Sequence, residues 1–225
     1  MKVSIIVPVF NESKTIRRVI DAVIAAPLGF DAEKEIIVVD DGSQDGTPDI
    51  LRAISEIQVI SVEKNQGKGA SVKRGFEAAT GDFIVIQDAD LEYDTKDISS
   101  LLKPLVNGDS DVVFGDRFNG EKHTVIYKRN YAGNKFLTFF SNLCTGLHIG
   151  DMEVGYKAFR KDVVDSFKSK LLSKRFGIEP EMVCRVARGR SENGNRWRVS
   201  EVPVNYYGRT YEEGKKIHWW DGLKA

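Results

Sequence analysis

The chain lacks any stretch long and apolar enough to cross a lipid bilayer, a span that takes about eighteen or more consecutive apolar residues. The apolar run at residues 3–9 is also too short for a signal peptide, and a helix signal soon follows it. We therefore expect a cytoplasmic protein that is either soluble or peripheral to a membrane.

An excess of charge of either sign is also missing. Lys plus Arg and Asp plus Glu each number 33, so the formal net charge is zero. A general nucleic-acid binder normally has a basic excess, so we expect no nucleic-acid partner.

The two cysteines, Cys144 and Cys184, lack CxxC spacing, which predicts reduced, buried thiols. The three histidines, His123, His148 and His218, form no local cluster, which argues against a zinc site.

Short apolar segments alternate with helix patterns along the 225 residues. Such alternation is typical of a mostly parallel sheet covered by helices, and the length suits one α/β domain over residues 1–225. The expected strands cover residues 3–9, 35–41, 57–62, 82–87 and 111–115. Helix patterns are found at residues 16–24, 45–54, 65–81 and 97–107.

Carboxylates stand at the ends of two of these predicted strands. Asp40 and Asp41 end the second, and Asp88 and Asp90 end the fourth. Asp is common in turns, so either pair alone is best interpreted as turn chemistry. Ligands of parallel sheets bind beyond the carboxyl ends of the strands, however, so two acid pairs at one edge indicate a site.

Two common nucleotide-binding motifs are absent. No GxGxxG follows the first strand, and the segment NQGKGAS at residues 65–71 does not match the P-loop pattern GxxxxGK[ST]. We expect Gly67 and Gly69 to let this loop turn tightly into its helix, beside the site.

The spacing of the acids after the fourth strand has a chemical explanation. On extended backbone, residues two apart point to the same side, so Asp88, Asp90 and Glu92 would converge. Carboxylates without His or Cys suit Mg²⁺ or Mn²⁺. One or two carboxylates leave the metal shell incomplete, and diphosphate oxygens of a nucleotide would complete it. A metal there also neutralises charge on a leaving diphosphate.

An ordered set of motifs then carries a resemblance. IIVPVFNE, IIVVDDGSQDGT, NQGKGASVKRGFEAATGD and QDADLE resemble family 2 glycosyltransferases, whose GT-A fold is a Rossmann-like three-layer sandwich. VFGDRF, GDMEVGYKAFRKDVV, GIEPEMVCRVA and VPVNYYGRTYEEGKKI are similar to dolichol-phosphate mannose synthases and bacterial polyprenyl-phosphate glycosyltransferases. The resemblance implies inverting, metal-dependent transfer of a hexose, mannose or glucose, from a GDP- or UDP-sugar to a polyprenyl phosphate such as dolichyl or undecaprenyl phosphate.

On the donor side, the resemblance implies a nucleoside pocket in which Asp41 accepts a hydrogen bond from the base. The pocket residues are Pro8, Phe10, Glu12, Val39 and Asp41. Without the resemblance, Pro8 is equally well a strand stop, and Glu12 a charge at a helix start.

The resemblance also implies that Asp88, Ala89 and Asp90 lie at the diphosphate. Asp90 is the expected metal ligand, with Glu92 second, and Asp88 contacts ribose or diphosphate. Arg117 is expected near phosphate, where a guanidinium binds two oxygens. Asp88, Asp90 and Arg117 form the expected catalytic set. From pattern alone, Arg117 would make a surface salt bridge.

Residues 125–148 read as a helix with an apolar stripe. Its members are Ala132, Phe136, Phe139, Phe140, Leu143 and Leu147, with Lys128, Arg129 and Lys135 nearby. The pattern alone favours a helix whose stripe is core. The resemblance favours equally a helix at a membrane interface, with Asn134 lining the acceptor side.

The tail, residues 206–225, carries Arg209 and Lys215. By resemblance these two bind the acceptor phosphate together with Arg117, whereas from pattern alone the tail is a solvated, mixed-charge segment. Trp219 and Trp220 suit a membrane interface or a substrate platform.

The sequence shows no obvious general base, which is compatible with a lipid-phosphate acceptor but does not prove one. A sugar hydroxyl would need a base, but a phosphate monoester is already anionic at neutral pH and its oxygen attacks directly. Two alternatives stay open: a soluble or glycan acceptor, and a noncatalytic nucleotide-sugar-binding subunit. The partners that the resemblance implies are a nucleotide sugar, a polyprenyl phosphate and the cytoplasmic face of a membrane.

Overall fold

The structure, a computed structural model, describes residues 1–122 and 128–209, with Lys128 and Arg129 as backbone only. The strands are β1 (Lys2–Val9), β2 (Glu33–Asp40), β3 (Gln58–Ser61), β4 (Phe83–Ile86), β5 (Val112–Asp116), β6 (Lys157–Arg160) and β7 (Val199–Pro203). The α-helices are α1 (Ile16–Ala25), α2 (Thr47–Arg52), α3 (Lys68–Ala78), α4 (Ile98–Val106), α5 (Lys128–Thr145), α6 (Lys161–Phe167) and α7 (Ile178–Arg188). Two 3₁₀ turns are η1 (Thr95–Asp97) and η2 (Lys168–Lys170).

These strands form one sheet in the order β3-β2-β1-β4-β6-β5-β7. β6 runs antiparallel to its neighbours β4 and β5, and every other pairing in the sheet is parallel. The prediction of an α/β fold with a mostly parallel central sheet is confirmed.

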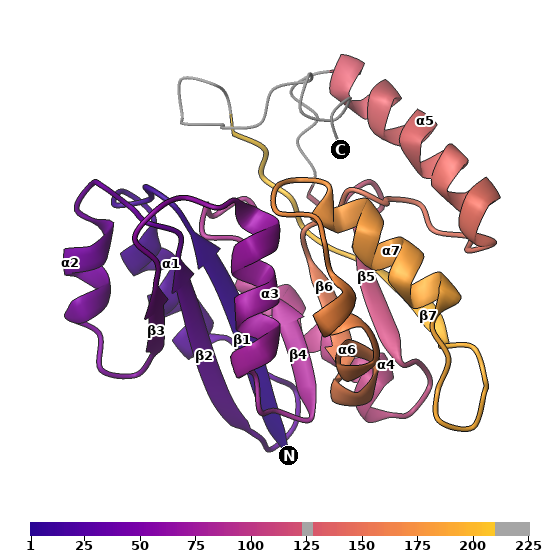
Figure 1. The fold of residues 1–225 in the computed structure, drawn as a ribbon, viewed down its shortest axis with the longest axis horizontal. Helices are drawn as coiled ribbons and strands as arrows, with labels where there is room; N and C mark the ends of the chain where they lie inside the picture. Colours follow the sequence, from indigo (N-terminus) through magenta and orange to yellow (C-terminus); the bar gives the residue numbers. More distant parts are fainter. Residues whose placement is uncertain (123–127, 210–225) are drawn as a thin grey trace.

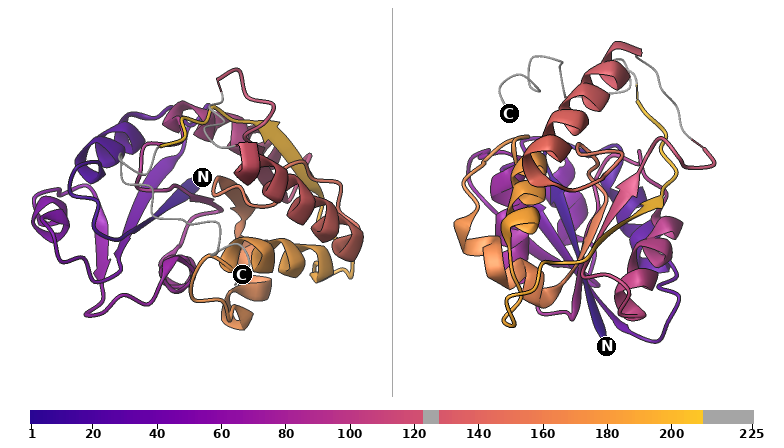
Figure 2. Two further views of the ribbon diagram at one scale, coloured as in Figure 1. Left: turned by 90° about the horizontal axis from the view of Figure 1, so that it is seen from above. Right: turned by 90° about the vertical axis from the view of Figure 1, so that its right-hand side faces the viewer.

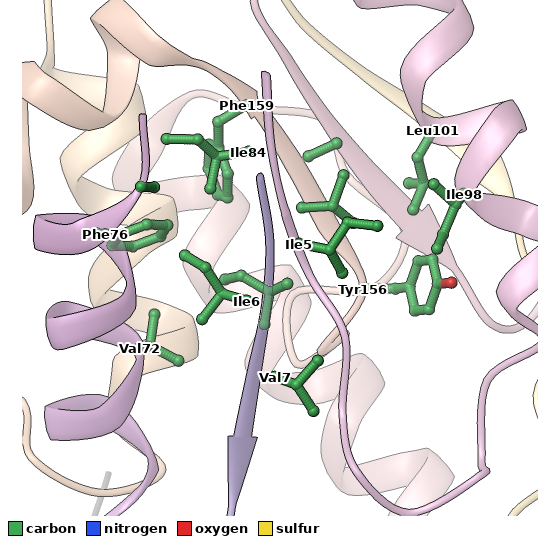
Figure 3. Packing of buried hydrophobic residues seen from close by; sticks show 14 of the residues in the cluster. Ile5, Ile6, Val7, Val72, Phe76, Ile84, Ile98, Leu101, Tyr156 and Phe159 are labelled. Carbon is green, nitrogen blue, oxygen red and sulfur yellow. The ribbon is translucent and has the colours of Figure 1, made fainter. Parts of the chain in front are cut away.

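The sheet is apolar on both faces because helices cover both. Ile5 and Ile6 are successive residues of β1 and so point to opposite sides. Ile6 packs against Val72 and Phe76 of α3, and Ile5 points toward Leu101 of α4 (Figure 3). All five side chains are fully buried. A strand buried on both faces reads as a continuous apolar run, which explains the composition of β1.

The helices make two layers around the sheet. Figures 1 and 2 show α3, α6 and α7 on one side of it and α1 and α4 on the other. The helix α5 lies beyond the carboxyl ends of the strands and contacts α7 (Figure 1). The loops that leave β1, β2 and β4 lie at this same edge, so the predicted donor-side residues on these loops lie along it.

The cysteines correct one expectation. Both are free, as predicted, but Cys144 is exposed and Cys184 is half-buried rather than buried. Cys144 lies on the outer side of α5, next to the exposed Leu143, so its apolar neighbourhood in the sequence is not a core neighbourhood.

Candidate active site

The predicted nucleoside pocket begins where β1 and β2 end side by side. Pro8 pairs with Val39 in the parallel register, and Phe10 and Glu12 follow directly after β1. Val39 is fully buried, whereas Pro8, Phe10 and Glu12 are half-buried. The structure therefore brings these four residues to one place at the sheet edge.

Asp41 organises the loop that enters α3. Its two carboxylate oxygens accept hydrogen bonds from the backbone N–H groups of Gln66 (2.9 Å) and Gly67 (2.7 Å). Gly67 has φ +103°, and a Cβ there would collide with the carbonyl oxygen of Lys174, so glycine is required. Each Asp41 oxygen keeps a second lone pair that can accept a hydrogen bond from a further donor. The expected contact with a nucleotide base stays a prediction.

The acids after β4 lie on a turn, so the assumption of extended backbone is wrong. Leu91 has φ +61°, a left-handed conformation that is uncommon for a non-glycine residue. Asp90 caps the turn by accepting a hydrogen bond from the Glu92 N–H at 3.1 Å. Burial, followed by the nearby charges of Asp88 and Glu92, raises the pKa of Asp90 to about 7. The charges of Asp88 and Glu92 thus act on Asp90 although the backbone bends between the three acids.

Arg209 lies against these same carboxylates. Its guanidinium is 3.2 Å from Asp90, 3.4 Å from Glu92 and 3.5 Å from Glu12. Burial lowers the pKa of Arg209, and the charges of Asp90, Glu12 and Glu92 outweigh burial and raise it. The hydroxyl of Tyr206, three residues before Arg209, donates to Glu92 at 2.6 Å and so holds this end of the described chain against the acids. In this state the predicted acceptor residue Arg209 is the counter-charge of the predicted metal ligands.

Thr15, which sequence reasoning did not name, connects two loops of the candidate site. Its hydroxyl lies 2.8 Å from a Glu12 carboxylate oxygen and 2.9 Å from the carbonyl oxygen of Ala89. Thr15 therefore links the loop after β1 to the loop after β4. In the sequence it is only one of several polar residues before a helix, so no signal marked it.

Asp88 does not face Arg209 but pairs with Lys68, a second residue that sequence reasoning missed. The Lys68 ammonium lies 2.7 Å from Asp88 and 3.0 Å from Glu179 of α7, and Glu179 in turn lies 2.5 Å from the ammonium of Lys157. The GK pair after Asn65 was the available signal, and it was interpreted only as a turn into a helix.

Arg117 makes a buried, two-pronged ion pair with Asp151. Its Nε and Nη2 donate to the two carboxylate oxygens at 2.6 and 2.8 Å. Burial lowers the pKa of Arg117, and the Asp151 charge outweighs burial and raises it. Asn134 of α5 donates to the same carboxylate at 3.0 Å, and the guanidinium lies 5.2 Å from the ring centre of Tyr206. Arg117 thus joins β5, α5 and the tail segment.

The interpretation of the α5 stripe as core is wrong for its large side chains. Phe136, Phe139, Phe140 and Leu143 are 67%, 66%, 56% and 71% exposed. The inner side of α5 is polar: Thr138 is buried and its hydroxyl accepts from the Met152 N–H at 3.0 Å, while Lys135 donates to the Gly150 carbonyl at 2.9 Å. Of the remaining predicted stripe, Ala132 is exposed and Leu147 is half-buried.

Several predictions fall on parts that the structure leaves undescribed. Lys215, Trp219 and Trp220 lie outside the described residues, as do the side chains of Lys128 and Arg129. In residues 1–122 and 128–209, no helix is long and apolar enough to cross a membrane. In the same ranges, no three His, Cys, Asp or Glu side chains converge as a ready-made metal site.

Comparison with known proteins agrees with this architecture. Residues 4–167 match the family described as Glycosyl transferase family 2. The undecaprenyl-phosphate 4-deoxy-4-formamido-L-arabinose transferase of Aeromonas hydrophila is 30% identical over 169 residues, 73% of this chain and 50% of that protein. The dodecaprenyl-phosphate galacturonate synthase of Rhizobium johnstonii is 25% identical over 221 residues, 96% of this chain and 62% of that protein. Glycosyltransferase AglD of Haloferax volcanii is 25% identical and covers 92% of this chain, which spans 33% of AglD.

Solved structures support the fold. Glucosyl-3-phosphoglycerate synthase of Mycobacterium tuberculosis has a TM-score of 0.70 at 22% identity, covering 94% of this chain and 74% of that one. Another structure of that enzyme, in complex with Mn²⁺, UDP and glucosyl-3-phosphoglycerate, has a TM-score of 0.66 at 22% identity, with the same coverage of both chains. These neighbours confirm the predicted GT-A fold.

The chain spans from a third to about three fifths of the length of the curated relatives named above. The family match itself covers well over half of the chain, and the relatives are named as sugar transferases acting with polyprenyl phosphates or as glycosyltransferases. This chain therefore belongs to glycosyl transferase family 2.

Proposed function

We propose that this protein transfers a hexose, mannose or glucose, from a GDP- or UDP-sugar to a polyprenyl phosphate, with inversion at the anomeric carbon and with a divalent metal. The observation that carries the proposal is the connection between the exposed apolar side of α5 and Arg117, made through Asn134 and Asp151. A helix surface suited to lipid is thereby connected, through two side chains, to a cation suited to phosphate. The names of two relatives, which specify undecaprenyl and dodecaprenyl phosphate, support this acceptor class.

The carboxylates after β4 fit Mg²⁺ or Mn²⁺. Asp90 and Glu92 are oxygen donors beside Glu12. Burial, followed by the charges of Asp88 and Glu92, raises the pKa of Asp90 to about 7, and a bound cation would favour the ionised carboxylate. Asp90 would be the first ligand and Glu92 the second, with the remaining positions filled by donor oxygens. Bound there, the metal would neutralise charge on the departing diphosphate.

The donor would then occupy the edge formed by β1, β2 and β4. Pro8, Phe10, Glu12 and Val39 would line the nucleoside, and Asp41 would accept a hydrogen bond from the base. Asp88, Ala89 and Asp90 would lie along the diphosphate. Val39, Asp41 and Ala89 are buried at this edge, whereas Pro8 and Phe10 are half-buried.

The acceptor phosphate would bind to Arg117 and Arg209, with Lys215 as a further contact. Asp151 takes the Nε–H and one Nη2–H of Arg117, so the remaining N–H groups on Nη1 and Nη2 would bind phosphate. Arg209 would have to leave the carboxylates before it turned toward an acceptor, and a divalent cation arriving there would release it. The two arginines would then hold the second phosphate group beside the first despite their repulsion.

The reaction needs little else from the protein. A phosphate oxygen of the acceptor attacks the anomeric carbon from the face opposite the diphosphate and forms the new C–O bond. The bond between the anomeric carbon and the diphosphate breaks, and the electron pair leaves with the nucleotide. Because the acceptor oxygen is already anionic, no side chain has to remove a proton.

The outer side of α5 would lie in the membrane surface at the cytoplasmic face. Aromatic and leucine side chains enter the boundary between head groups and acyl chains, and the polar inner side faces the protein. The protein would thus meet its lipid as a peripheral protein at the level where the polyprenyl phosphate head group lies.

A panel of donors and acceptors tests the proposal. GDP-mannose, GDP-glucose, UDP-glucose and UDP-mannose are each offered with polyprenyl phosphate in liposomes, with 3-phosphoglycerate, or with no acceptor, in Mg²⁺ or Mn²⁺. We expect nucleotide release that depends on polyprenyl phosphate and on metal. Release with 3-phosphoglycerate instead would favour the soluble acceptor, and binding without release would favour a noncatalytic subunit.

A further inference from the structure

Lys68 lies between two carboxylates that come from different parts of the chain. Its ammonium is 2.7 Å from Asp88 and 3.0 Å from Glu179, and its side chain is 18% exposed. Burial lowers the pKa of Lys68, but the charges of Asp88 and Glu179 outweigh burial and keep it well above the usual value. Lys68 therefore stays protonated over the pH range of any transfer assay.

The interaction continues into the interior as a chain of alternating charges. Glu179 contacts the ammonium of Lys157, which is fully buried and also donates to the carbonyl of Val154. Each charge thus has an opposite neighbour, which is the condition under which buried charges are tolerated. Of the two residues at the ends, Asp88 is the one at the proposed donor site.

The position of Asp88 is fixed from a second direction by Gly155. A Cβ at residue 155 would collide with the other oxygen of the Asp88 carboxylate, while the Gly155 N–H donates to the hydroxyl of Tyr93 at 2.9 Å. The carboxylate is thus held between an ammonium and a stretch of backbone. Its side chain is only 18% exposed, so it has little freedom to adopt another orientation.

The charge of Lys68 has a consequence for donor binding. Asp88 and Asp90 are both acidic, and a nucleotide diphosphate is also negative, so the three groups repel one another. Arg209 or a metal offsets the charge on the Asp90 side, and Lys68 offsets it on the Asp88 side. Without Lys68, Asp88 would face Glu179 without its counter-charge.

We propose that Lys68 is a positioning residue for the nucleotide-sugar donor: it holds and neutralises Asp88 so that a nucleoside diphosphate sugar binds beside Asp90. The proposal rests on the proposed function, because it takes the donor to be such a compound. It assigns Lys68 to the donor side alone, so the affinity for the acceptor does not depend on it.

Calorimetric titration with UDP-glucose and with GDP-mannose, each with Mn²⁺, tests the assignment. Lys68→Gln should raise the Kd of the preferred donor by about ten- to a hundredfold, the equivalent of one charged hydrogen bond. Lys68→Arg keeps the charge and should restore most of the affinity. Lys73→Gln is the matched control, because Lys73 lies on the same helix and donates to the Leu171 carbonyl. The KM for polyprenyl phosphate should be the same in all three variants.

A double-mutant cycle separates positioning from general stabilisation. If Lys68 acts through Asp88, Lys68→Gln combined with Asp88→Asn should bind donor within about twofold of Asp88→Asn alone. Losses that simply add, or a normal donor Kd in folded Lys68→Gln, would overturn the proposal. A wild-type protein that binds neither nucleotide sugar would instead refute the proposed function.

Gly155→Ala provides a variant that leaves every charge in place. The added methyl group would displace the Asp88 carboxylate, so donor affinity should fall by roughly tenfold, about one charge-assisted contact. This variant decides the matter if Lys68→Gln does not fold. An unchanged donor Kd in Gly155→Ala would contradict the claim that the position of Asp88 controls donor binding.

Discussion

Replacing Arg209 by alanine should make the donor-free protein bind Mn²⁺ more tightly. In the structure the Arg209 guanidinium contacts Glu12, Asp90 and Glu92 at 3.2–3.5 Å, where we place the metal. Metal and guanidinium then compete for the same oxygens. The metal binds only the fraction of molecules in which Arg209 has left, so its apparent affinity is reduced by that fraction.

The size of the effect follows from the contacts. None of the four side chains is more than 22% exposed, so solvent screens the ion pairs only in part. A hydrogen bond between charged groups contributes about 1.5–3 kcal/mol, and about 1.4 kcal/mol corresponds to a tenfold change in affinity. Arg209→Ala should therefore lower the Kd for Mn²⁺ by about ten- to a hundredfold. The same variant should transfer sugar more slowly, because the proposed acceptor contact is lost.

Manganese titrations followed by electron paramagnetic resonance would measure this Kd. Arg209 lowers the pKa of Asp90, so its removal makes protonation of Asp90 compete more strongly with metal near neutral pH. The titration is therefore repeated at increasing pH from 8 upward, because the Asp90 pKa of about 7 applies with Arg209 in place and is higher in the variant. Arg209→Lys keeps the positive charge, and Arg52→Ala removes an arginine from an exposed pair with Asp49. An Arg209→Ala protein that binds Mn²⁺ no better than these controls would refute the competition.

Three further predictions concern other parts of the site. Asp90→Asn should fold normally and lose transfer activity by about a hundredfold or more in a radiolabel assay, and full activity would contradict its role as metal ligand. Phe139→Ser and Phe140→Ser should each weaken liposome binding by roughly tenfold without lowering the melting temperature, whereas a loss of stability would contradict their exposure. Asp151→Asn leaves Arg117 without its buried partner, so urea unfolding should show a loss of about 3 kcal/mol, and an unchanged midpoint would contradict that pairing.

Part of the fold was predictable because it depends on local pattern. The strands β1 to β5 are short apolar runs, and each predicted strand ends within two residues of the observed one. No element was predicted for β6 and β7, which contain Lys157 and Glu201. The charge of Lys157 is balanced by Glu179 of α7, and no local pattern shows that partnership.

The grouping of the candidate site residues was more predictable than their geometry. Acids at the ends of β2 and β4 were expected to gather at one edge of the sheet because parallel strands end together, and they lie at that edge. The prediction of extended backbone after β4 was wrong, because nothing in the sequence signals that Leu91 adopts a left-handed conformation. The partners of Asp88 and Arg117, namely Lys68 and Asp151, were missed because these ion pairs form only through tertiary packing.

The orientation of α5 shows the same limit. A stripe of apolar residues at helical spacing predicts that one side is covered, but it does not say by what. The buried side proved to be polar, with Thr138 and Asn134 bonded to the segment around Asp151. Periodicity identified the helix correctly, and only its tertiary contacts showed that Phe136 and Phe139 point outward.

Mass spectrometry of the lipid product tests the central claim most directly. The protein is incubated with the preferred nucleotide sugar and polyprenyl phosphate in liposomes, first with Mn²⁺ and then with a chelator. The account predicts one hexose added to the polyprenyl phosphate, through its phosphate oxygen, in the presence of metal only. A polyprenyl phosphate that stays unmodified while the nucleotide sugar is consumed, or equal product in chelator, would contradict the account.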